Sequence, residues 1–243
     1  MIRALISTLF CLLFTVSSHA QTLTIAQDPW PPFVDEDAAG QGLSIEIVRA
    51  ALEPKGYQIK MNFVPWARAL NGVKNAQYDV LASAWFTQER SEYLAFSDDY
   101  LSNEIKFIMR SKDSFQYNGM DSLTGKNIGV VRGYGYGDEF LNATNFKRHE
   151  TKDLVSNVKK LVAGRIDLTL EDELVAKSLL AKEAPEMLGK ITFVTNPLST
   201  KPMHIAVGKK NPKHQQIIQD FNQGLKEIKA SGKFQELVNK YIK

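Results

Sequence analysis

Apolar residues in the first third of the chain recur with two periods, the period of two of a strand and the three-to-four-residue spacing of a helix. Leu23 and Ile25 alternate with polar neighbours and begin a first strand, while Val80, Leu81 and Ala82 form the apolar run of a strand covered on both faces. Between them the pattern predicts a helix capped by Ser44 and reaching Leu52, a strand at residues 59–64, and a helix from Pro65 to about Asn75. This β-α-β-α-β order implies a mostly parallel sheet.

A second copy of this plan begins near the middle of the chain. Residues 128–131 form an apolar strand that breaks at 132–137, Arg-Gly-Tyr-Gly-Tyr-Gly, and a helical stripe follows at residues 154–162. Asp79 and Asp167 each stand at the start of an apolar strand that follows a helix. The repetition predicts two similar α/β lobes and not one continuous sheet.

The tail and one extended segment indicate how the lobes connect. A strand at residues 204–207 precedes two amphipathic helices, which are separated by Gly232. Residues 104–110 read as an extended segment leading out of the first lobe. One outward and one returning crossing make a two-segment hinge. The sequence therefore predicts a first lobe of residues 21–107 and 202–243, and a second lobe of residues 108–201.

Residues 1–20 have the composition of a secretory signal peptide. Arg3 precedes an apolar core that ends in Ser-His-Ala, and a membrane anchor would need a longer core of about 20 apolar residues. We expect cleavage after Ala20 and export to the periplasm as a soluble protein. The single cysteine, Cys11, leaves with the peptide, which excludes a disulfide, a thiolate nucleophile or a cysteine-ligated metal in the mature chain.

Charge excludes further classes of partner. Cleavage removes Arg3 from the 30 lysines and arginines and leaves all 27 acidic residues, so the net charge is +2. No basic run follows, and nucleic acid is not an expected partner. The mature histidines His149, His204 and His214 are scattered and form no triad or metal signature, so neither a metal nor another cofactor is expected.

Arg90 is the strongest single candidate for ligand binding. Thr87 can cap a short helix that carries Arg90 just past the carboxyl end of the strand at 80–82, where open α/β sheets bind ligands. A guanidinium there suits a carboxylate held by two parallel hydrogen bonds. The alternative is a solvated arginine near Glu89 and Glu92.

Four motifs in order give the chain a resemblance to a known family. Residues 30–33 read Trp-Pro-Pro-Phe, 87–90 read Thr-Gln-Glu-Arg, 164–172 contain Gly-Arg-Ile-Asp and a later Asp172, and two helices close the chain. The mature chain thus resembles the family-3 extracytoplasmic solute-binding proteins over essentially its whole length. The resemblance implies the type II periplasmic-binding-protein fold, with two lobes of mixed, mostly parallel sheet flanked by helices.

The resemblance also implies roles for particular residues. Arg90 would clamp a ligand α-carboxylate, Asp172 would meet its α-ammonium, and Trp30 and Trp66 would lie against its side chain. Burial in the core is the alternative for the tryptophans, and a solvated acidic run for Asp172 with Glu171 and Glu173. The full candidate ligand-binding set is Arg90, Asp172, Trp30, Trp66, Ser83, Trp85 and Tyr134.

Two departures from the family pattern concern the residues that would hold the ligand carboxylate together with Arg90. The loop at 83–86 is one residue shorter than in many amino-acid binders and carries Trp85 and Phe86 where small hydroxyl residues are common. Residues 133–135 are Gly-Tyr-Gly where the family often has glycine followed by serine or threonine. Both changes bear on which ligand the site accepts.

The resulting prediction is a monomeric binding protein, not an enzyme. It would capture a small polar solute, an amino acid or related carboxylate-bearing compound, and deliver it to the membrane permease of an ABC importer. Two alternatives stay open. One is a dehydratase-like enzyme on the same fold, in which Glu171 or Glu173 would be the proton donor, and the other is a sensor or accessory protein without a transporter.

Overall fold

The computed structural model describes residues 21–242, so the predicted signal peptide and Cys11 lie outside the described residues. Strands and helices alternate along most of the chain. In order they are β1 (Gln21–Gln27), α1 (Leu43–Leu52), η1 (Glu53–Lys55), β2 (Tyr57–Phe63), α2 (Trp66–Lys74), β3 (Val80–Trp85), α3 (Gln88–Tyr93), β4 (Leu94–Phe96), β5 (Leu101–Arg110), η2 (Met120–Leu123), β6 (Asn127–Val131), α4 (Asp138–Asn142), β7 (Lys147–Thr151), α5 (Leu154–Val162), β8 (Leu168–Asp172), α6 (Glu173–Glu183), η3 (Pro185–Lys190), β9 (Ile191–Phe193), β10 (Ser199–Gly208), α7 (His214–Ala230) and α8 (Lys233–Tyr241).

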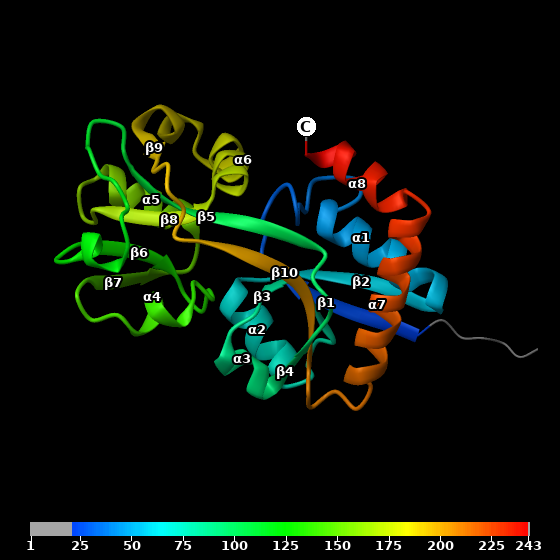
Figure 1. Ribbon diagram of the computed structural model, residues 1–243. Coiled ribbons are helices and arrows are strands. Elements are labelled where there is room, and N and C mark those ends of the chain that lie inside the picture. The colour runs from blue at the N-terminus through cyan, green and yellow to red at the C-terminus, as the bar shows by residue number, and fades with distance from the viewer. Residues whose placement is uncertain (1–20, 243) are drawn as a thin grey trace, which may run out of the picture.

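The elements form two groups that are joined by the long strands β5 and β10 (Figure 1). We call residues 21–100 and 209–242 the first half and residues 111–198 the second half. In the first half β1 pairs in parallel with β2 and β3, and in the second β6 pairs in parallel with β7 and β8. The antiparallel strands β10 and β5 complete each mixed sheet. The predicted α/β class and its β-α-β-α-β order are confirmed.

The prediction that the two sheets are unconnected is wrong. The strands form one hydrogen-bonded path in the order β2-β1-β3-β10-β5-β8-β6-β7. The path is continuous because β5 and β10 pair with each other, from Ser199 opposite Ile105 to Met203 opposite Leu101, in addition to pairing with the strands of each half. The predicted lobe boundaries at 107/108 and 201/202 fall inside these two shared strands.

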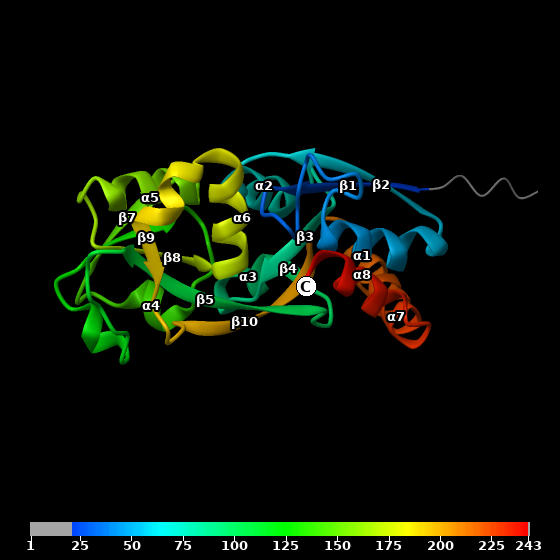
Figure 2. The ribbon, with the colours of Figure 1, turned by 90° about the horizontal axis from the view of Figure 1, so that it is seen from above.

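Helices cover both faces of the sheet in the first half. Helix α1 packs against α7 and α8 on one side, as Figure 2 shows, and α2 packs on the other. Trp66 and Val73 of α2 share a cluster with Leu81 of β3, while Ile47 of α1 and Phe221 of α7 belong to the main core. All six residues of β3 are buried for this reason, which explains why five of them are apolar and only Ser83 is polar.

The repeated aspartates have a structural role. Asp79 accepts hydrogen bonds from the backbone N–H and the hydroxyl of Thr24, at 2.8 and 2.7 Å. Asp167 accepts one from the backbone N–H of Asn127 at 2.7 Å. Each carboxylate therefore ties the start of one strand, β3 or β8, to its parallel neighbour, β1 or β6.

Ser44 does not cap α1 as predicted. The helix begins at Leu43 after Gly42, whose φ of 100° turns the chain, and Ser44 is buried with its hydroxyl 3.5 Å from the sulfur of Met203. A Cβ on Gly42 would lie 2.4 Å from the carbonyl oxygen of Phe33. The close approach of the loop after β1 thus displaces the start of the helix. Thr87, in contrast, caps α3 as predicted, accepting from the N–H of Arg90 at 3.1 Å.

Candidate functional site

A small cavity lies where the carboxyl ends of β1 and β3 meet the loop after β6. It leaves about 20 Å³ for the centres of water-sized molecules, which is room for about one water. Six of the seven predicted ligand-binding residues line it, and Asp172 does not. The lining residues are Gln27, Asp28, Trp30, Trp66, Ser83, Trp85, Arg90, Tyr134 and Gly135.

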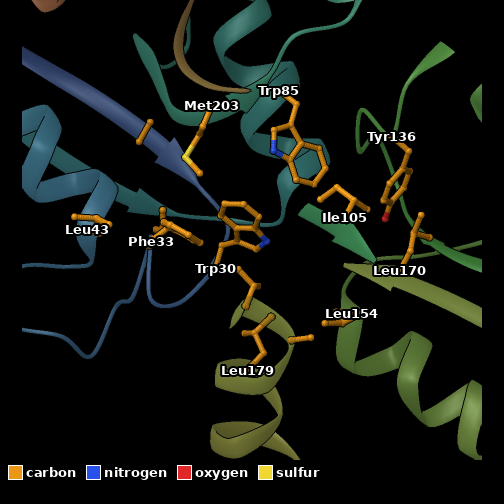
Figure 3. Close-up of a cluster of buried hydrophobic side chains, with 14 of the residues drawn as sticks. Trp30, Phe33, Leu43, Trp85, Ile105, Tyr136, Leu154, Leu170, Leu179 and Met203 are labelled. Carbon is orange, nitrogen blue, oxygen red and sulfur yellow. The ribbon is translucent and has the colours of Figure 1, made fainter. Parts of the chain in front are cut away.

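Four of the nine lining residues are aromatic, and they include all three tryptophans of the chain. The ring of Trp85 lies 5.7 Å from that of Trp30 and 5.5 Å from that of Tyr134, in both cases edge to face. Trp66 meets Tyr134 in the same way at 5.9 Å. Figure 3 shows the rings of Trp30 and Trp85 between Met203 of β10 and Tyr136 of the second half. The cavity is therefore an aromatic cage between the halves.

Arg90 is the cation of the cage, and it is only 4% exposed. Its Nη1 donates to the carbonyl of Trp85 at 2.7 Å and its Nη2 to the carbonyl of Gly133 at 2.6 Å. The guanidinium carbon stands 5.1 Å from the ring centre of Trp66. Burial lowers the pKa of Arg90 to about 10, so the side chain stays charged at neutral pH. The solvated-surface alternative is excluded by this burial.

The loop after β6 fits against Arg90 because it is rich in glycine. Gly133 has a φ of 77°, and its carbonyl accepts from Trp66 Nε1 at 2.7 Å as well as from Arg90. A Cβ on Gly135 would lie 2.9 Å from the Thr87 methyl group and 3.0 Å from Arg90 Nη1. The Gly-Tyr-Gly departure from the family pattern thus lets the second half approach the guanidinium closely.

Asp28 is a site residue that sequence reasoning missed. Its carboxylate accepts from the hydroxyl of Tyr134 at 2.9 Å and from Gln27 Nε2 at 3.2 Å. Burial raises the pKa of Asp28 to about 6. Its position in the sequence could have identified it as a site residue, because Asp28 directly follows the last residue of β1 at the carboxyl edge of the sheet.

Ser83 holds the floor of the cavity with its backbone. Its N–H donates to Gln27 Oε1 and its carbonyl accepts from Gln27 Nε2, both at 3.3 Å. The Ser83 hydroxyl lies 3.3 Å from that of Tyr100, which donates to the carbonyl of Ala82 at 2.7 Å. Gln27, also missed by sequence reasoning, therefore fixes the end of β1 against β3.

Asp172 does not line the cavity and is linked to its wall through Asn103. One of its oxygens accepts from the N–H groups of Leu174 and Val175, at 2.8 and 3.1 Å, which makes it the N-cap of α6. The other accepts from Asn103 Nδ2 at 3.0 Å, and Asn103 Oδ1 lies 3.4 Å from Trp85 Nε1. Asp172 is 9% exposed as a residue, and this pair of contacts through Asn103 links it to Trp85 of the cage.

Glu171, the preceding residue, is fully buried beside the same wall. Its Oε1 accepts from the N–H of Asp172 at 2.9 Å, whereas Oε2 has no hydrogen-bond partner among the described residues. Burial raises the pKa of Glu171 to about 8, so the carboxyl is mostly protonated at pH 7. The alternative of a solvated acidic run is excluded for Glu171 by this burial.

The halves also touch outside the cage. Lys182 of α6 pairs with Asp35, at 3.2 Å, and with Asp37, both on the loop after β1.

Within residues 21–242 no group of three or more potential metal-ligating side chains lies together, and no helix has the length and apolar composition that a bilayer crossing requires. The side chains that line the cage can form hydrogen bonds, charge pairs and aromatic contacts.

Comparison with known proteins agrees with this geometry. Residues 23–243 match the model of the bacterial extracellular solute-binding proteins, family 3. The arginine-binding periplasmic protein of Mannheimia haemolytica is 26% identical over 245 residues, which cover 97% of this chain and 98% of that protein. A probable histidine-binding protein of Campylobacter jejuni is 27% identical, over 90% of this chain and 84% of that protein.

Solved structures share the fold. An ancestral arginine-binding protein bound to arginine has a TM-score of 0.78 at 21% identity, covering 93% of this chain and all of that one. A histidine kinase sensor domain with similarity to periplasmic binding proteins reaches 0.78 at 18% identity, over 93% and 97%. An ancestral amino-acid-binding protein described as a precursor of cyclohexadienyl dehydratase reaches 0.71 at 21%, over 91% and 96%.

The two halves, the shared strands and the site between them define a binding protein that encloses its ligand. The chain belongs to the bacterial extracellular solute-binding proteins, family 3. The predicted family and the type II periplasmic-binding-protein fold are confirmed.

Proposed function

We propose that this protein binds a small solute with a carboxylate and at least one cationic group, an amino acid or a close relative, and delivers it to the permease of an ABC importer. The observation that carries the proposal is the aromatic cage between the halves, with the guanidinium of Arg90 and the carboxylate of Asp28 in its wall. The relatives are named for arginine and histidine, which are solutes of this kind.

Binding requires the halves to separate and close again. The cavity has room for about one water, so a solute enters only when the lobes at 21–107 with 202–243 and at 108–201 move apart. The two crossings of β5 and β10 are the hinge. A ligand that contacts both lobes favours the closed form by its differential affinity, and the permease then meets that form.

Each polar residue of the site has a role in this scheme. Arg90 exchanges the carbonyl of Gly133 for the ligand carboxylate, with which it forms two parallel hydrogen bonds. Asp172 meets the α-ammonium, and Trp30, Trp66, Trp85 and Tyr134 enclose the apolar part of the side chain. Ser83 offers its hydroxyl at the floor. The protein acts as an exported monomer, needs no cofactor and carries out no reaction.

One observation favours a second candidate function. Glu171 is a buried carboxylic acid that keeps its proton at neutral pH, as a general acid in a dehydratase would. The alternative enzyme would consume its ligand, whereas the binding protein returns it unchanged.

A thermal-shift screen of the exported protein tests both candidates. Amino acids, polyamines, oligosaccharides and aromatic acids are compared, and we expect amino acids to raise the melting temperature because a ligand that binds only the folded state stabilises it. Each hit is then incubated with the protein and recovered for mass spectrometry. Recovery of the intact solute supports the binding protein, and its conversion supports the enzyme. A response confined to oligosaccharides would contradict the proposed solute class.

A further inference from the structure

We infer that Trp66 is the second donor of the carboxylate site. Its indole N–H and the guanidinium of Arg90 together hold one ligand oxygen, in the position that the carbonyl oxygen of Gly133 occupies in the structure. The inference rests on the proposed function and deepens it, because it names the residue that completes the site beside Arg90. Trp66 then binds the ligand through a hydrogen bond as well as through its ring.

Two donors of the first half meet at one oxygen atom of the second half. Trp66 Nε1 donates to the carbonyl oxygen of Gly133 at 2.7 Å, and Arg90 Nη2 donates to the same oxygen at 2.6 Å. Both side chains are 4% exposed. An oxygen atom with two lone pairs accepts both bonds at once. A carboxylate oxygen adds a negative charge, and it therefore suits this pair of donors better than a neutral carbonyl does.

The two donors keep their relative position because both belong to the first half. Trp66 is the first residue of α2, directly after Pro65, and Arg90 lies on α3, which Thr87 caps. The guanidinium carbon of Arg90 lies 5.1 Å from the ring centre of Trp66. Nη1 of Arg90 also donates to the carbonyl of Trp85, at 2.7 Å, within the same half. The pair of donors is thus assembled without a contribution from the second half.

Gly133, the shared acceptor, belongs to the loop after β6 in the second half. In the proposed function the halves separate before a solute enters, and this movement takes the Gly133 carbonyl away from both donors. A buried donor without a partner costs free energy, so the two donors favour a ligand that brings an acceptor with it. Because Arg90 is charged, an ionised oxygen is the acceptor that compensates the pair best.

Other donors that line the cavity have partners of their own. The N–H of Ser83 donates to Gln27 Oε1 at 3.3 Å, and Trp85 Nε1 lies 3.4 Å from Asn103 Oδ1. Within residues 21–242, Trp66 is the one tryptophan whose N–H shares an acceptor with Arg90. The indole of Trp66 is therefore the donor that is placed to help the guanidinium.

This arrangement gives the carboxylate three hydrogen bonds. One oxygen lies between Trp66 Nε1 and Arg90 Nη2, and the other accepts from Nη1, which has a second N–H besides the one that it gives to Trp85. A neutral carboxamide has one oxygen and one NH₂ group, so at least one of the three donors would face another donor. The site thus distinguishes a carboxylate from a carboxamide.

Calorimetry with L-arginine and L-argininamide tests the inference, because the amide has a neutral carboxamide in place of the carboxylate. The exported protein is titrated at pH 7.5 as the wild type, Trp66→Phe and Trp66→His. We expect Trp66→Phe to bind arginine about ten-fold more weakly and argininamide no more than about three-fold more weakly. Trp66→His should bind arginine within about three-fold of the wild type. If the thermal-shift screen selects another amino acid, that amino acid and its amide replace this pair.

The two variants separate hydrogen bonding from packing. Phenylalanine keeps an apolar ring and has no donor, whereas a neutral histidine has a smaller apolar surface and can place an N–H where the indole has one. If Trp66 acts only through ring contact, Trp66→Phe binds arginine better than Trp66→His does. If its N–H holds the carboxylate, the order is reversed.

Tyr78→Phe is the control. Tyr78 packs against α2, where a Cβ on Gly72 would lie 2.4 Å from Tyr78 Cδ2, and it does not line the cavity. This variant should bind both probes as the wild type does. If the Trp66 variants fail to fold, nitrogen-15 NMR of the wild type decides. The indole proton of Trp66 should move downfield when arginine binds and not when argininamide binds, because a charged acceptor forms the stronger bond.

Four results overturn the inference. They are unchanged arginine binding in Trp66→Phe, weaker arginine binding in Trp66→His than in Trp66→Phe, equal losses for arginine and argininamide, and an indole proton of Trp66 that responds alike to both probes. Each of these leaves the proposed function intact, because arginine still binds to the wild type. If no carboxylate in the wider panel binds to the wild type, the proposed function fails first and the inference fails with it.

Discussion

The hydroxyl of Tyr134 donates a 2.9 Å hydrogen bond to the carboxylate of Asp28, and this bond joins the two halves of the molecule at the site itself. The same tyrosine packs edge to face against Trp66 and Trp85. Tyr134 thus fills the space between the walls of the cage. In the proposed function, a ligand would compete with this side chain for Asp28.

Tyr134→Phe tests that competition. The substitution keeps the ring and removes the donor, so the ligand-free halves should separate more often and Asp28 should become available. A hydrogen bond to a charged group contributes about 1.5 to 3 kcal/mol, enough to shift the population by about ten-fold or more. We expect a larger ligand-free radius of gyration in small-angle scattering. An unchanged radius would mean that the Tyr134–Asp28 bond does not hold the halves together.

Arg90→Ala should remove most of the affinity for any ligand that carries a carboxylate. Leaving one member of a buried charge pair alone costs about 2 to 5 kcal/mol, or roughly thirty-fold to several thousand-fold in the dissociation constant. Arg90→Lys should restore only part of it, because lysine supplies charge without two parallel donors. Isothermal calorimetry makes the comparison, and equal constants for all three proteins would exclude Arg90 as the clamp.

Gly135→Ala should impair closure without affecting folding. The added Cβ would lie 2.9 Å from the Thr87 methyl group and 3.0 Å from Arg90 Nη1, across the interface between the halves. Overpacking of this kind costs about 1 to 3 kcal/mol, so we expect about ten-fold weaker binding. Gly189→Ala is the control, because no atom lies within 4 Å of a Cβ there. Similar melting temperatures with different affinities confirm the prediction, and equal affinities contradict it.

Asp172→Asn separates a clamp made by both halves from a pocket confined to the first. Asparagine is as good an N-cap as aspartate, so α6 and the ligand-free stability should be preserved. A ligand with an ammonium should bind more weakly, and scattering should show that the mutant needs more ligand for the same contraction. If mutant and wild type bind and contract alike, Asp172 is a helix cap and nothing more.

Glu171 should make the ligand-free protein less stable as the pH rises. Its pKa is raised to about 8 in the folded protein, whereas the unfolded carboxyl is already ionised above pH 6. The unfolded state therefore binds fewer protons, and the free energy of unfolding should fall by about 2 to 3 kcal/mol between pH 6 and 8. Denaturant titrations of Glu171→Gln should show no such fall. Parallel pH profiles for the two proteins would rule out Glu171 as the titrating group.

Local patterns in the sequence were sufficient for many of the elements and for much of the site, although β4, α4, β7, α6 and β9 were not predicted. The periods of two and of three to four residues reflect which faces are buried, and the predicted strands and helices form within a few residues of their expected ends. Thr87 caps α3 through a contact three residues away, so its role was readable from the chain alone. The cavity brings together Arg90, Trp30 and Trp66, which follow β3, β1 and β2, because residues just past strand ends meet at one edge of a sheet. Ser83 and Trp85 belong to the end of β3 itself, and Tyr134 reaches the cavity from the other half, in the loop after β6.

The sequence by itself thus determined the class of fold, the family and the positively charged, aromatic character of the site. Tertiary structure alone decided which residues meet, such as Gly133 with Arg90 and Tyr134 with Asp28. It also decided that β5 and β10 join the strands of both halves into one path. These contacts join residues that are about 40 to more than 100 positions apart, so no local pattern records them. The same holds for Glu171 and Asp172. Successive residues of a strand point to opposite faces, and only the packing around β8 buries Glu171 completely and makes Asp172 the N-cap of α6.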